Sequence, residues 1–214
     1  MTIMSHHFPN LYLITDRHLI PDDRDFLITL EELLKAGVRM IQLREKDLSA
    51  AELYPLAHQL RNLTHRYNSL LLINDRIDLA LAINADGVQL GHHSLPIHVA
   101  RQILGKHQII GASTHSLQEV KTAQSQGADF ITYGPVYFTP SKAMYGKPVG
   151  TKSLQQICRN CRLPVYALGG IGLDNAHATM QTGVLGISVM SALMAASSPN
   201  QACHKLLSEI RKEG

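Results

Sequence analysis

Short apolar, β-branched stretches alternate along this chain with segments whose apolar residues recur at helical spacing. The short stretches predict strands at 11–14, 38–43, 70–74, 87–90, 109–113, 130–133, 164–168 and 185–189. The helical spacing predicts helices at 25–36, from 49 onward, at 76–83, 95–104, 116–127, 152–158 and 174–183, and near the C-terminus. Strands that alternate with helices in this way are typical of a parallel sheet covered by helices.

Eight such units favour a sheet that closes into a barrel over an open, doubly wound sheet. The chain has 214 residues, which is near the short end for a (β/α)₈ TIM barrel. No Pro/Ser linker or break in composition divides it. We therefore expect an α/β fold with a single (β/α)₈ barrel domain over residues 1–214, in which residues 1–10 are an N-terminal extension.

Local signals fix several of the expected helix ends. Ser49 with Glu52, and Ser116 with Glu119, have the spacing of capping boxes. Asp174 is expected to cap the helix before residue 183. Pro55 should bend its helix or delay its start, because proline cannot donate a backbone hydrogen bond.

Composition narrows the range of partners. Hydrophobic residues make up 45% of the chain and charged residues 17%, and the formal net charge is +3. There is no run of Lys or Arg, so nucleic acid is not indicated, whereas anionic small molecules are compatible with the charge. The N-terminus lacks the apolar region of a signal peptide, and the apolar stretch 183–196 is too short for a membrane span. We expect a cytoplasmic protein with no membrane partner; the sequence leaves its oligomeric state open, a homo-oligomer included.

The cysteines are few and odd in number: Cys158, Cys161 and Cys203. This set favours a reducing compartment over a disulfide framework. Cys158 and Cys161 have C-x-x-C spacing, but Cys203 alone cannot complete a zinc site. Idle thiols are the favoured interpretation.

A small polar cluster follows most of the predicted strands directly. Such clusters are 44–46, 74–75, 113–115, 139–142 and 169–170. A parallel barrel places the loops after its strands on one rim, where its active site is built. The pattern therefore predicts one site assembled from distant segments.

Two of the clusters carry cations suited to phosphate. Gln42, Arg44 and Lys46 alternate along a strand end, so they should project together; arginine supplies a fork and lysine a point charge. The alternative is a solvated turn. In the long loop 134–150, Thr139, Ser141 and Lys142 have the composition of a clamp for a diphosphate; the alternative is an ordinary turn.

Two further clusters suggest a metal and a second phosphate. Asp75 follows Asn74 at a strand end and could hold Mg²⁺ together with substrate phosphates; alternatively it pairs with Arg76 or caps the next helix. Gly169-Gly170 and Ser191 follow the last two strands, where barrels often bind phosphate; the alternative for the glycines is a tight turn.

Ser113 and His115 follow the fifth strand. His115 is a natural acid/base candidate because its pKa in the free amino acid lies near neutrality. No aspartate in this motif would orient it, so a Ser–His–Asp triad is not supported. His92-His93 is only a weak metal signal.

The order of these motifs resembles the thiamine-phosphate synthase and thiazole tautomerase family. The residues that carry the resemblance, in groups, are Gln42-x-Arg44-Glu45-Lys46, Asn74-Asp75, Ala85-Asp86-Gly87-Val88, Gly111-x-Ser113-x-His115, Gly127-Ala128-Asp129, Gly134-Pro135-Val136, Thr139-x-Ser141-Lys142 and Leu168-Gly169-Gly170-Ile171. The resemblance spans about residues 11–196. It implies a (β/α)₈ barrel that joins hydroxymethylpyrimidine diphosphate to a thiazole phosphate or its carboxylated form, with release of pyrophosphate.

The resemblance also implies a role for each matched residue. Arg44, Lys46, Lys142 and Mg²⁺ would stabilise the departing diphosphate, with Asp75 as the metal ligand. Gln42 and Asn74 would hold the pyrimidine diphosphate, and Ser113 would lie near the reacting carbon. By the same resemblance, the diphosphate would be bound by Thr139 and Ser141, and the thiazole phosphate by Gly170 and Ser191.

The chain departs from the synthase pattern at two positions after the fourth strand. Ser94 stands where synthases carry a second Mg²⁺-binding Asp, and Gln89 stands where they commonly carry His. Two alternatives to the synthase therefore stay open. One is a thiazole tautomerase in which His115 shuttles a proton; the other is a non-catalytic barrel that binds a phosphorylated ligand for regulation.

Overall fold

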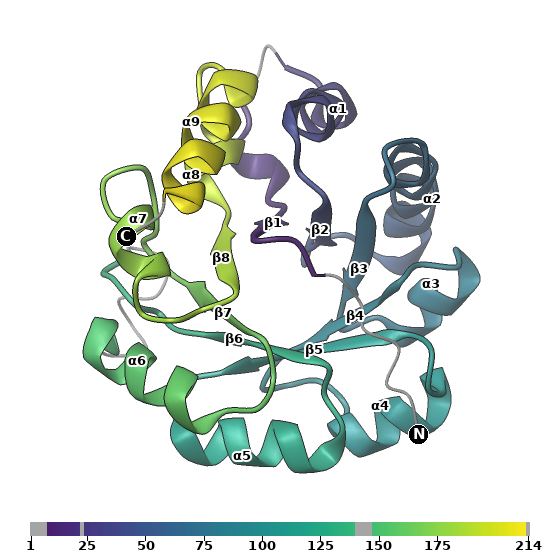
Figure 1. Cartoon of the computed structure of the whole chain (residues 1–214). Coiled ribbons are helices and arrows are strands. Elements are labelled where there is room, and N and C mark those ends of the chain that lie inside the picture. The colour runs from purple at the N-terminus through teal and green to yellow at the C-terminus, as the bar shows by residue number, and fades with distance from the viewer. Residues whose placement is uncertain (1–7, 22–23, 140–146, 213–214) are drawn as a thin grey trace.

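The eight predicted strands form a closed parallel barrel in chain order, β1 to β8 (Figure 1). The computed structural model describes residues 8–21, 24–139 and 147–212. The strands are β1 (Leu11–Ile14), β2 (Met40–Leu43), β3 (Leu70–Asn74), β4 (Gly87–Leu90), β5 (Ile109–Thr114), β6 (Phe130–Tyr133), β7 (Val165–Leu168) and β8 (Gly186–Val189). Pairing of β1 with β8, through Tyr12 and Ser188 among others, closes the sheet. The predicted TIM barrel is confirmed.

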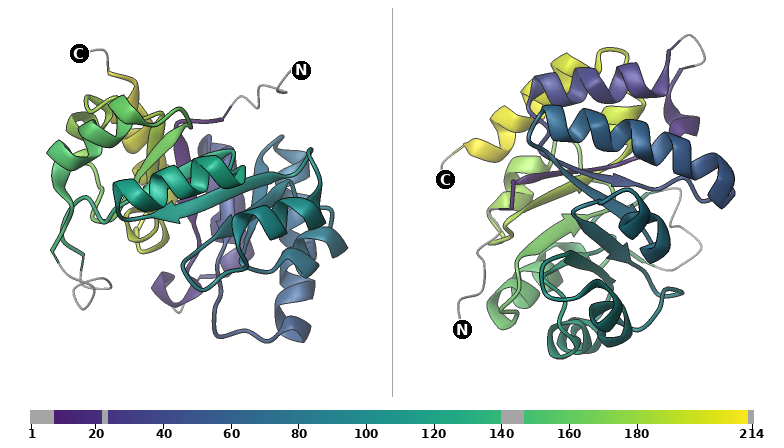
Figure 2. Two further views of the ribbon diagram at one scale, coloured as in Figure 1. Left: turned by 90° about the horizontal axis from the view of Figure 1, so that it is seen from below. Right: turned by 90° about the vertical axis from the view of Figure 1, so that its right-hand side faces the viewer.

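Helices surround the barrel and cover its outer face (Figures 1 and 2). They are η1 (Arg17–Leu19), α1 (Phe26–Ala36), α2 (Ala50–Arg66), α3 (Ile77–Ala82), α4 (Ile97–Leu104), α5 (Leu117–Gln126), α6 (Gly150–Asn160), α7 (Ala176–Met180), α8 (Ser191–Met194) and α9 (Pro199–Arg211). None of the helices within the described ranges is long and apolar enough to cross a membrane.

The capping signals set some helix ends as predicted and others differently. The Ser49–Glu52 box forms in full, and α2 continues through Pro55 from Ala50, so the expected delay of its start is wrong. At α5, Ser116 accepts from the Glu119 backbone, but the Glu119 carboxylate accepts from the His115 backbone N–H (2.7 Å). The second box is therefore only half formed.

Helix α7 is not capped by Asp174 as expected. Its N-cap is Asn175, whose side chain makes no capping bond to the helix. Instead, Asn175 Nδ2 donates to the Gly170 carbonyl (2.9 Å), and its Oδ1 accepts from the Gly172 backbone (3.0 Å). The amide ties the turn after β7 because it can both donate and accept, which a carboxylate cannot.

Two apolar cores hold the barrel. The larger one lies between the strands and the helices, and a smaller one fills the barrel interior. The interior core is largely aromatic, with Tyr12, Phe130 and Tyr166 rings in tilted or edge-to-face contact at centroid distances of 5.4–5.7 Å. Such contacts stabilise beyond simple burial.

A layer of polar side chains lies in the barrel beside this aromatic core. Its members come from alternate strands and are at most 2% exposed: Gln42, Gln89, Thr132 and Ser188. Barrel interiors are ordinarily filled by layers of four mostly branched apolar residues from alternate strands. At Gln42, Gln89 and Thr132 the fold therefore gives up apolar packing for hydrogen bonding, whereas the Ser188 hydroxyl has no partner among the described residues.

Candidate active site

The carboxyl ends of the strands carry the residues that the sequence singles out. In strand order these are Arg44 and Lys46 after β2, Asn74 and Asp75 at β3, Ser94 after β4, Ser113 and His115 at β5, Thr139 after β6, Gly170 after β7 and Ser191 after β8. Ser141 and Lys142 lie outside the described residues. All strands of the barrel are parallel, so these segments lie on one rim.

The cations after β2 are available for a ligand. Arg44 is half-buried and Lys46 is exposed. Within the described part of the chain, neither side chain pairs with a carboxylate. Strand β2 ends at Leu43, and residues 46–47 form a turn, so the alternation of a strand does not extend to Lys46. The prediction that Gln42, Arg44 and Lys46 project together therefore fails at Lys46.

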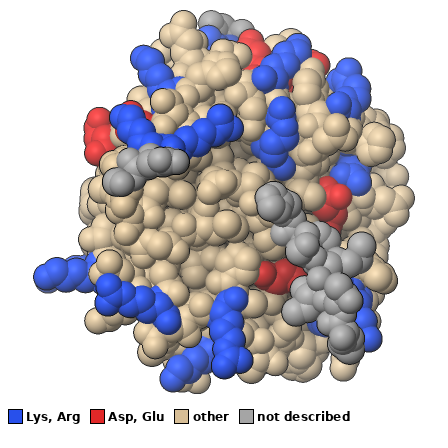
Figure 3. Space-filling view, viewed as in Figure 1, with Lys and Arg blue, Asp and Glu red and all other residues tan. Residues whose placement is uncertain are grey.

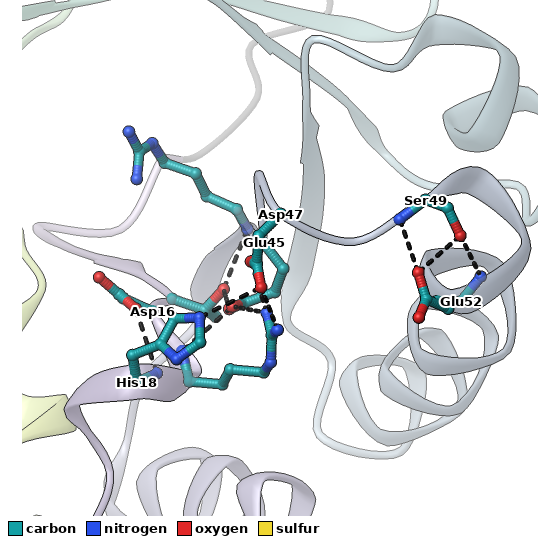
Figure 4. A network of polar contacts seen from close by, with 9 residues as sticks. Asp16, His18, Glu45, Asp47, Ser49 and Glu52 are labelled. Carbon is teal, nitrogen blue, oxygen red and sulfur yellow. Dashed lines mark hydrogen bonds and ion pairs between the residues drawn. The ribbon is translucent and has the colours of Figure 1, made fainter.

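The buried carboxylate of Glu45 fixes the start of this loop (Figure 4). Its Oε1 accepts from the Thr15 hydroxyl (2.6 Å), and its Oε2 accepts from the Arg17 backbone N–H (3.1 Å) and guanidinium (3.2 Å). The Thr15 hydroxyl oxygen in turn accepts from the Arg44 backbone N–H (2.9 Å). The segment after β1 therefore holds the backbone from which Arg44 projects.

Asp47 extends this network to the surface. The Arg17 guanidinium donates to both Asp47 oxygens, and His18 Nε2 lies 3.2 Å from Oδ2 (Figure 4). The hydrogen bond from Arg17 holds the pKa of Asp47 well below its usual range. Because the folded pKa is lowered, the ion pair is complete above the ordinary aspartate pKa of about 4 and is lost only as the pH falls further.

Asp75 is held by neutral donors. Asn74 Nδ2 donates to Oδ2 (2.8 Å), the Ser94 hydroxyl donates to Oδ1, and the Gly91 backbone N–H is 3.4 Å from Oδ1. The backbone of Asp75 is left-handed (φ +61°), a conformation that non-glycine residues seldom adopt. Arg76 pairs with Asp78 instead (2.6 Å), so the alternative that Asp75 pairs with Arg76 is wrong.

The other alternative for Asp75, a cap for the following helix, is also wrong. The N-cap of α3 is Arg76, and no side chain caps this helix. A half-buried carboxylate at a strand end, with unused lone pairs, fits a Mg²⁺ ion that takes its remaining ligands from phosphates and water. No cluster of three or more His, Cys, Asp or Glu occurs among the residues described. Asp75 would be a single carboxylate ligand of such an ion.

The two glycines after β7 serve packing as well as ligand approach. A Cβ at Gly170 would lie 2.6 Å from the Phe138 carbonyl oxygen, and one at Gly169 would lie 2.6 Å from Pro135 Cα. Both glycines have positive φ (+66° and +98°). The segment after β6 therefore packs against their backbone, which leaves no room for a side chain at either position. Within the described residues, the Gly170 N–H still meets no acceptor and stays free for an anion.

Four polar side chains form a hydrogen-bonded chain across the barrel. Gln42 Nε2 donates to Tyr12 Oη (2.9 Å), the Tyr12 hydroxyl donates to Gln89 Oε1 (3.3 Å), and Gln89 Nε2 donates to Ser113 Oγ (3.1 Å). Gln42 and Ser113, both singled out by sequence, are thus connected through Tyr12, which the sequence did not single out, and Gln89, which it singled out only as a departure from the synthase pattern. We call Gln42, Tyr12, Gln89 and Ser113 the polar chain.

His115 lies on the rim with its own carboxylate partner. Its Nδ1 is 3.1 Å from Glu119 Oε2, and both side chains are roughly half exposed. His115 precedes the N-cap Ser116, and Glu119 in the first turn of α5 reaches back to it, accepting also from the His115 backbone N–H (2.7 Å). An orienting group is therefore present, although it is a glutamate on α5 rather than the aspartate whose absence from the motif was noted.

Groups elsewhere in the described part of the chain do not form a comparable site. A hollow of ≈ 610 Å³ at the amino-terminal end of the barrel has Arg39 as its charged lining residue, and this guanidinium donates to the Leu34 and Val38 carbonyls.

Burial raises the pKa of Cys158 and of Cys203 to about 11, as expected for idle thiols. Lys and Arg are dispersed on the face in Figure 3, mostly away from its middle.

Comparison with known proteins places this site in a family. The model of the thiamine monophosphate synthase family matches residues 11–193. The chain is 44% identical to a thiamine-phosphate synthase of Clostridium novyi (86% of this chain, 90% of the relative). It is 40% identical to one of Clostridium acetobutylicum (94% and 95%).

A solved structure supports the same assignment. The thiamine phosphate pyrophosphorylase of Pyrococcus furiosus superposes with a TM-score of 0.85 at 40% identity, covering 94% of this chain and 95% of the other. The family model matches a range, residues 11–193, that contains all eight strands, β1 to β8. The chain belongs to the thiamine monophosphate synthase family.

Proposed function

We propose that this protein is a thiamine-phosphate synthase, a transferase of thiamine biosynthesis. It joins 4-amino-2-methyl-5-hydroxymethylpyrimidine diphosphate to 4-methyl-5-hydroxyethylthiazole phosphate, or to its carboxylated form. The observation that carries the proposal is the location, on one rim, of cations after β2 that pair with no carboxylate of the described residues, together with the Asp75 site at β3 and the Ser113 hydroxyl at β5. A regulatory phosphate-binding barrel has no need of this combination.

The reaction makes chemical sense of these groups. The bond between the pyrimidine methylene carbon and the diphosphate oxygen breaks, and its electron pair leaves with the diphosphate. The thiazole nitrogen then donates its lone pair to the resulting carbocation, which forms the new C–N bond. Arg44 and Lys46 stabilise the negative charge that develops on the leaving group; preorganised electrostatics of this kind is usually the largest catalytic contribution.

The remaining proposed roles divide between the two substrates. Gln42 and Asn74 hold the pyrimidine diphosphate, and the Ser113 hydroxyl lies near the reacting carbon. The diphosphate is bound by Thr139, Ser141 and Lys142, and the thiazole phosphate is bound by Gly170 and Ser191. Asp75 holds Mg²⁺, which supplies further positive charge to the diphosphate when it is bound.

The direct test is formation of product. The protein, incubated with the pyrimidine diphosphate, the thiazole phosphate and Mg²⁺, is expected to release pyrophosphate and form thiamine phosphate in equal amounts. Thiamine phosphate is measured by oxidation to its fluorescent thiochrome derivative. Release of neither product over hours, from a protein that is folded by circular dichroism, would overturn the proposal.

The His115–Glu119 pair is the observation that favours a tautomerase as second candidate. It provides an oriented imidazole on the rim, as a proton shuttle requires. We expect His115→Ala to leave synthase activity at a third or more of the wild-type kcat, because no step of the condensation requires a proton transfer. Isomerisation of the thiazole carboxylate phosphate, followed by NMR, is the matched assay. Isomerisation that depends on His115, together with no condensation, would establish the tautomerase instead.

A further inference from the structure

The polar chain has a defined donor and acceptor at each link. Each carboxamide contributes one donor group and one acceptor, and a tyrosine hydroxyl can do both at once. Gln42 donates to Tyr12, Tyr12 donates to Gln89, and Gln89 donates to Ser113. Since the Ser113 oxygen already accepts from Gln89, its own proton is directed elsewhere. Tyr12 accepts from the Nε2 of Gln42, so the carbonyl oxygen of the same amide makes no hydrogen bond to Tyr12.

Burial keeps this arrangement intact. Tyr12 is fully buried, and Gln42 and Gln89 are each 2% exposed, so water does not compete for their hydrogen bonds. Burial also raises the pKa of Tyr12 well above its ordinary value, so the phenol stays protonated and able to donate. A hydrogen bond in such surroundings is costly to leave unmade.

The backbone of β5 leaves space for Gln89. A Cβ at Gly111 would overlap Gln89 Oε1 and the Phe130 ring. Gly111 pairs directly with Gln89 in the sheet register. The carboxamide of Gln89 therefore occupies volume that any side chain at position 111 would fill, and this confines it to the position between Tyr12 and Ser113.

We propose that Gln89 is a positioning residue that orients the Ser113 hydroxyl toward the reacting carbon and, through Tyr12, orients the Gln42 carboxamide toward the pyrimidine. The two ends of the polar chain then present opposite functions to the substrate. The Gln42 carbonyl accepts, for example from an amino group of the pyrimidine, and the Ser113 hydroxyl donates. This inference rests on the proposed synthase activity, and it assigns Gln89 and Tyr12 parts in it.

The variant Gln89→Glu tests the inference through pH. A protonated carboxyl has one O–H donor and one carbonyl acceptor, enough for the links to Ser113 and Tyr12, although it lacks the second N–H of the carboxamide, whose nitrogen also lies 3.5 Å from Thr132 Oγ1. An ionised carboxylate can only accept and cannot donate to Ser113. Burial raises the pKa of the introduced carboxyl above the ordinary glutamate value of about 4.3. The ratio of variant to wild-type kcat should therefore be highest at low pH and fall roughly tenfold as the pH rises through that pKa.

Three matched variants separate positioning from packing. Gln89→Met keeps the volume but has neither donor nor acceptor, so its kcat ratio should be low at every pH. Tyr12→Phe should raise KM for the pyrimidine diphosphate and leave KM for the thiazole phosphate unchanged. Ser188→Ala, in the same buried layer, removes a hydroxyl without a partner within the described residues and should keep wild-type kinetics. Thermal unfolding at each pH shows whether a variant is folded under the assay conditions.

The result that overturns the inference is also defined. A folded Gln89→Glu protein whose kcat ratio does not change with pH, or a Gln89→Met protein with wild-type kcat, excludes the positioning role. A wild-type protein that forms no thiamine phosphate contradicts the proposed function instead. In that case NMR still tests the polar chain: Tyr12→Phe should shift the side-chain amide resonances of Gln42 and Gln89, and unchanged resonances would overturn it.

Discussion

Replacing Arg44 with alanine is expected to lower kcat for thiamine phosphate formation by a factor of about 10²–10³, the usual effect of removing one preorganised donor to developing charge. The half-buried guanidinium has no carboxylate partner within the described residues, so its charge is available to the leaving diphosphate. The loss should appear in kcat more than in KM, because negative charge on the leaving oxygen grows as the bond breaks. Steady-state kinetics with the pyrimidine diphosphate as varied substrate measures both.

Two controls sharpen this experiment. Arg44→Lys keeps the charge but loses the planar fork, and should recover part of the rate. Arg66→Ala removes an exposed arginine at the end of α2, whose contact with Glu31 is long (3.8 Å), and should leave the kinetics unchanged. If Arg44→Ala stays within a factor of three of the wild-type kcat, the leaving-group role of the cations after β2 is wrong.

Replacing Glu45 with alanine is expected to lower the free energy of unfolding by roughly 3 kcal/mol, at the lower end of the cost of breaking a buried charged pair. The Thr15 hydroxyl and the Arg17 backbone N–H lose their acceptor, whereas the Arg17 guanidinium keeps Asp47. For a chain of this size, that loss corresponds to a fall in Tm on the order of 10 °C. Urea titration followed by circular dichroism gives the free energy, and calorimetry gives Tm.

A surface glutamate provides the comparison. Glu209→Ala removes an i, i+3 ion pair with Lys212 whose lysine is half exposed, and such pairs contribute less than about 1 kcal/mol. Glu45→Ala should also lower kcat below the level of the Glu209 variant, because Thr15 then ceases to hold the Arg44 backbone. Equal stability of the two variants would show that the Glu45 network contributes nothing beyond a surface pair.

The barrel itself is well predicted from sequence because its signals are local. Each strand is a short, mostly apolar run, and the strands β3, β4 and β6 begin and end where the pattern predicts. Gly37, in the left-handed conformation at the end of α1, is a signal of the same kind. The failures are also local: Asp174 and Asn175 are both good capping residues, and the choice between them depends on the Gly170 carbonyl, which only the folded turn presents.

The site is less predictable, because its decisive contacts join residues far apart in sequence. Arg44 and Asp75 can be identified by their places after strands, but the Tyr12–Gln89 bond spans 77 positions and no periodicity reports it. The sequence nevertheless contains a signal for this layer. Gln42, Gln89 and Thr132 are polar residues at inward positions of short strands whose other residues are typical of buried strands. The role of Ser94 as a donor to Asp75, likewise, follows only from the approach of the loop after β4 to the end of β3.

The missing side chain at Gly111 couples three positions of the barrel, because the Gln89 carboxamide and the Phe130 ring fill the space that a side chain at 111 would need. Since the Gln89 carboxamide fills the space above that glycine, enlarging residue 111 displaces an amide on the neighbouring strand. A library that sets out to alter pyrimidine selectivity by randomising one position at a time will therefore lose most members at residue 111 for steric reasons alone. Joint randomisation of 89, 111 and 130, with smaller residues at 89 and 130 whenever residue 111 grows, is the way to redesign this part of the barrel.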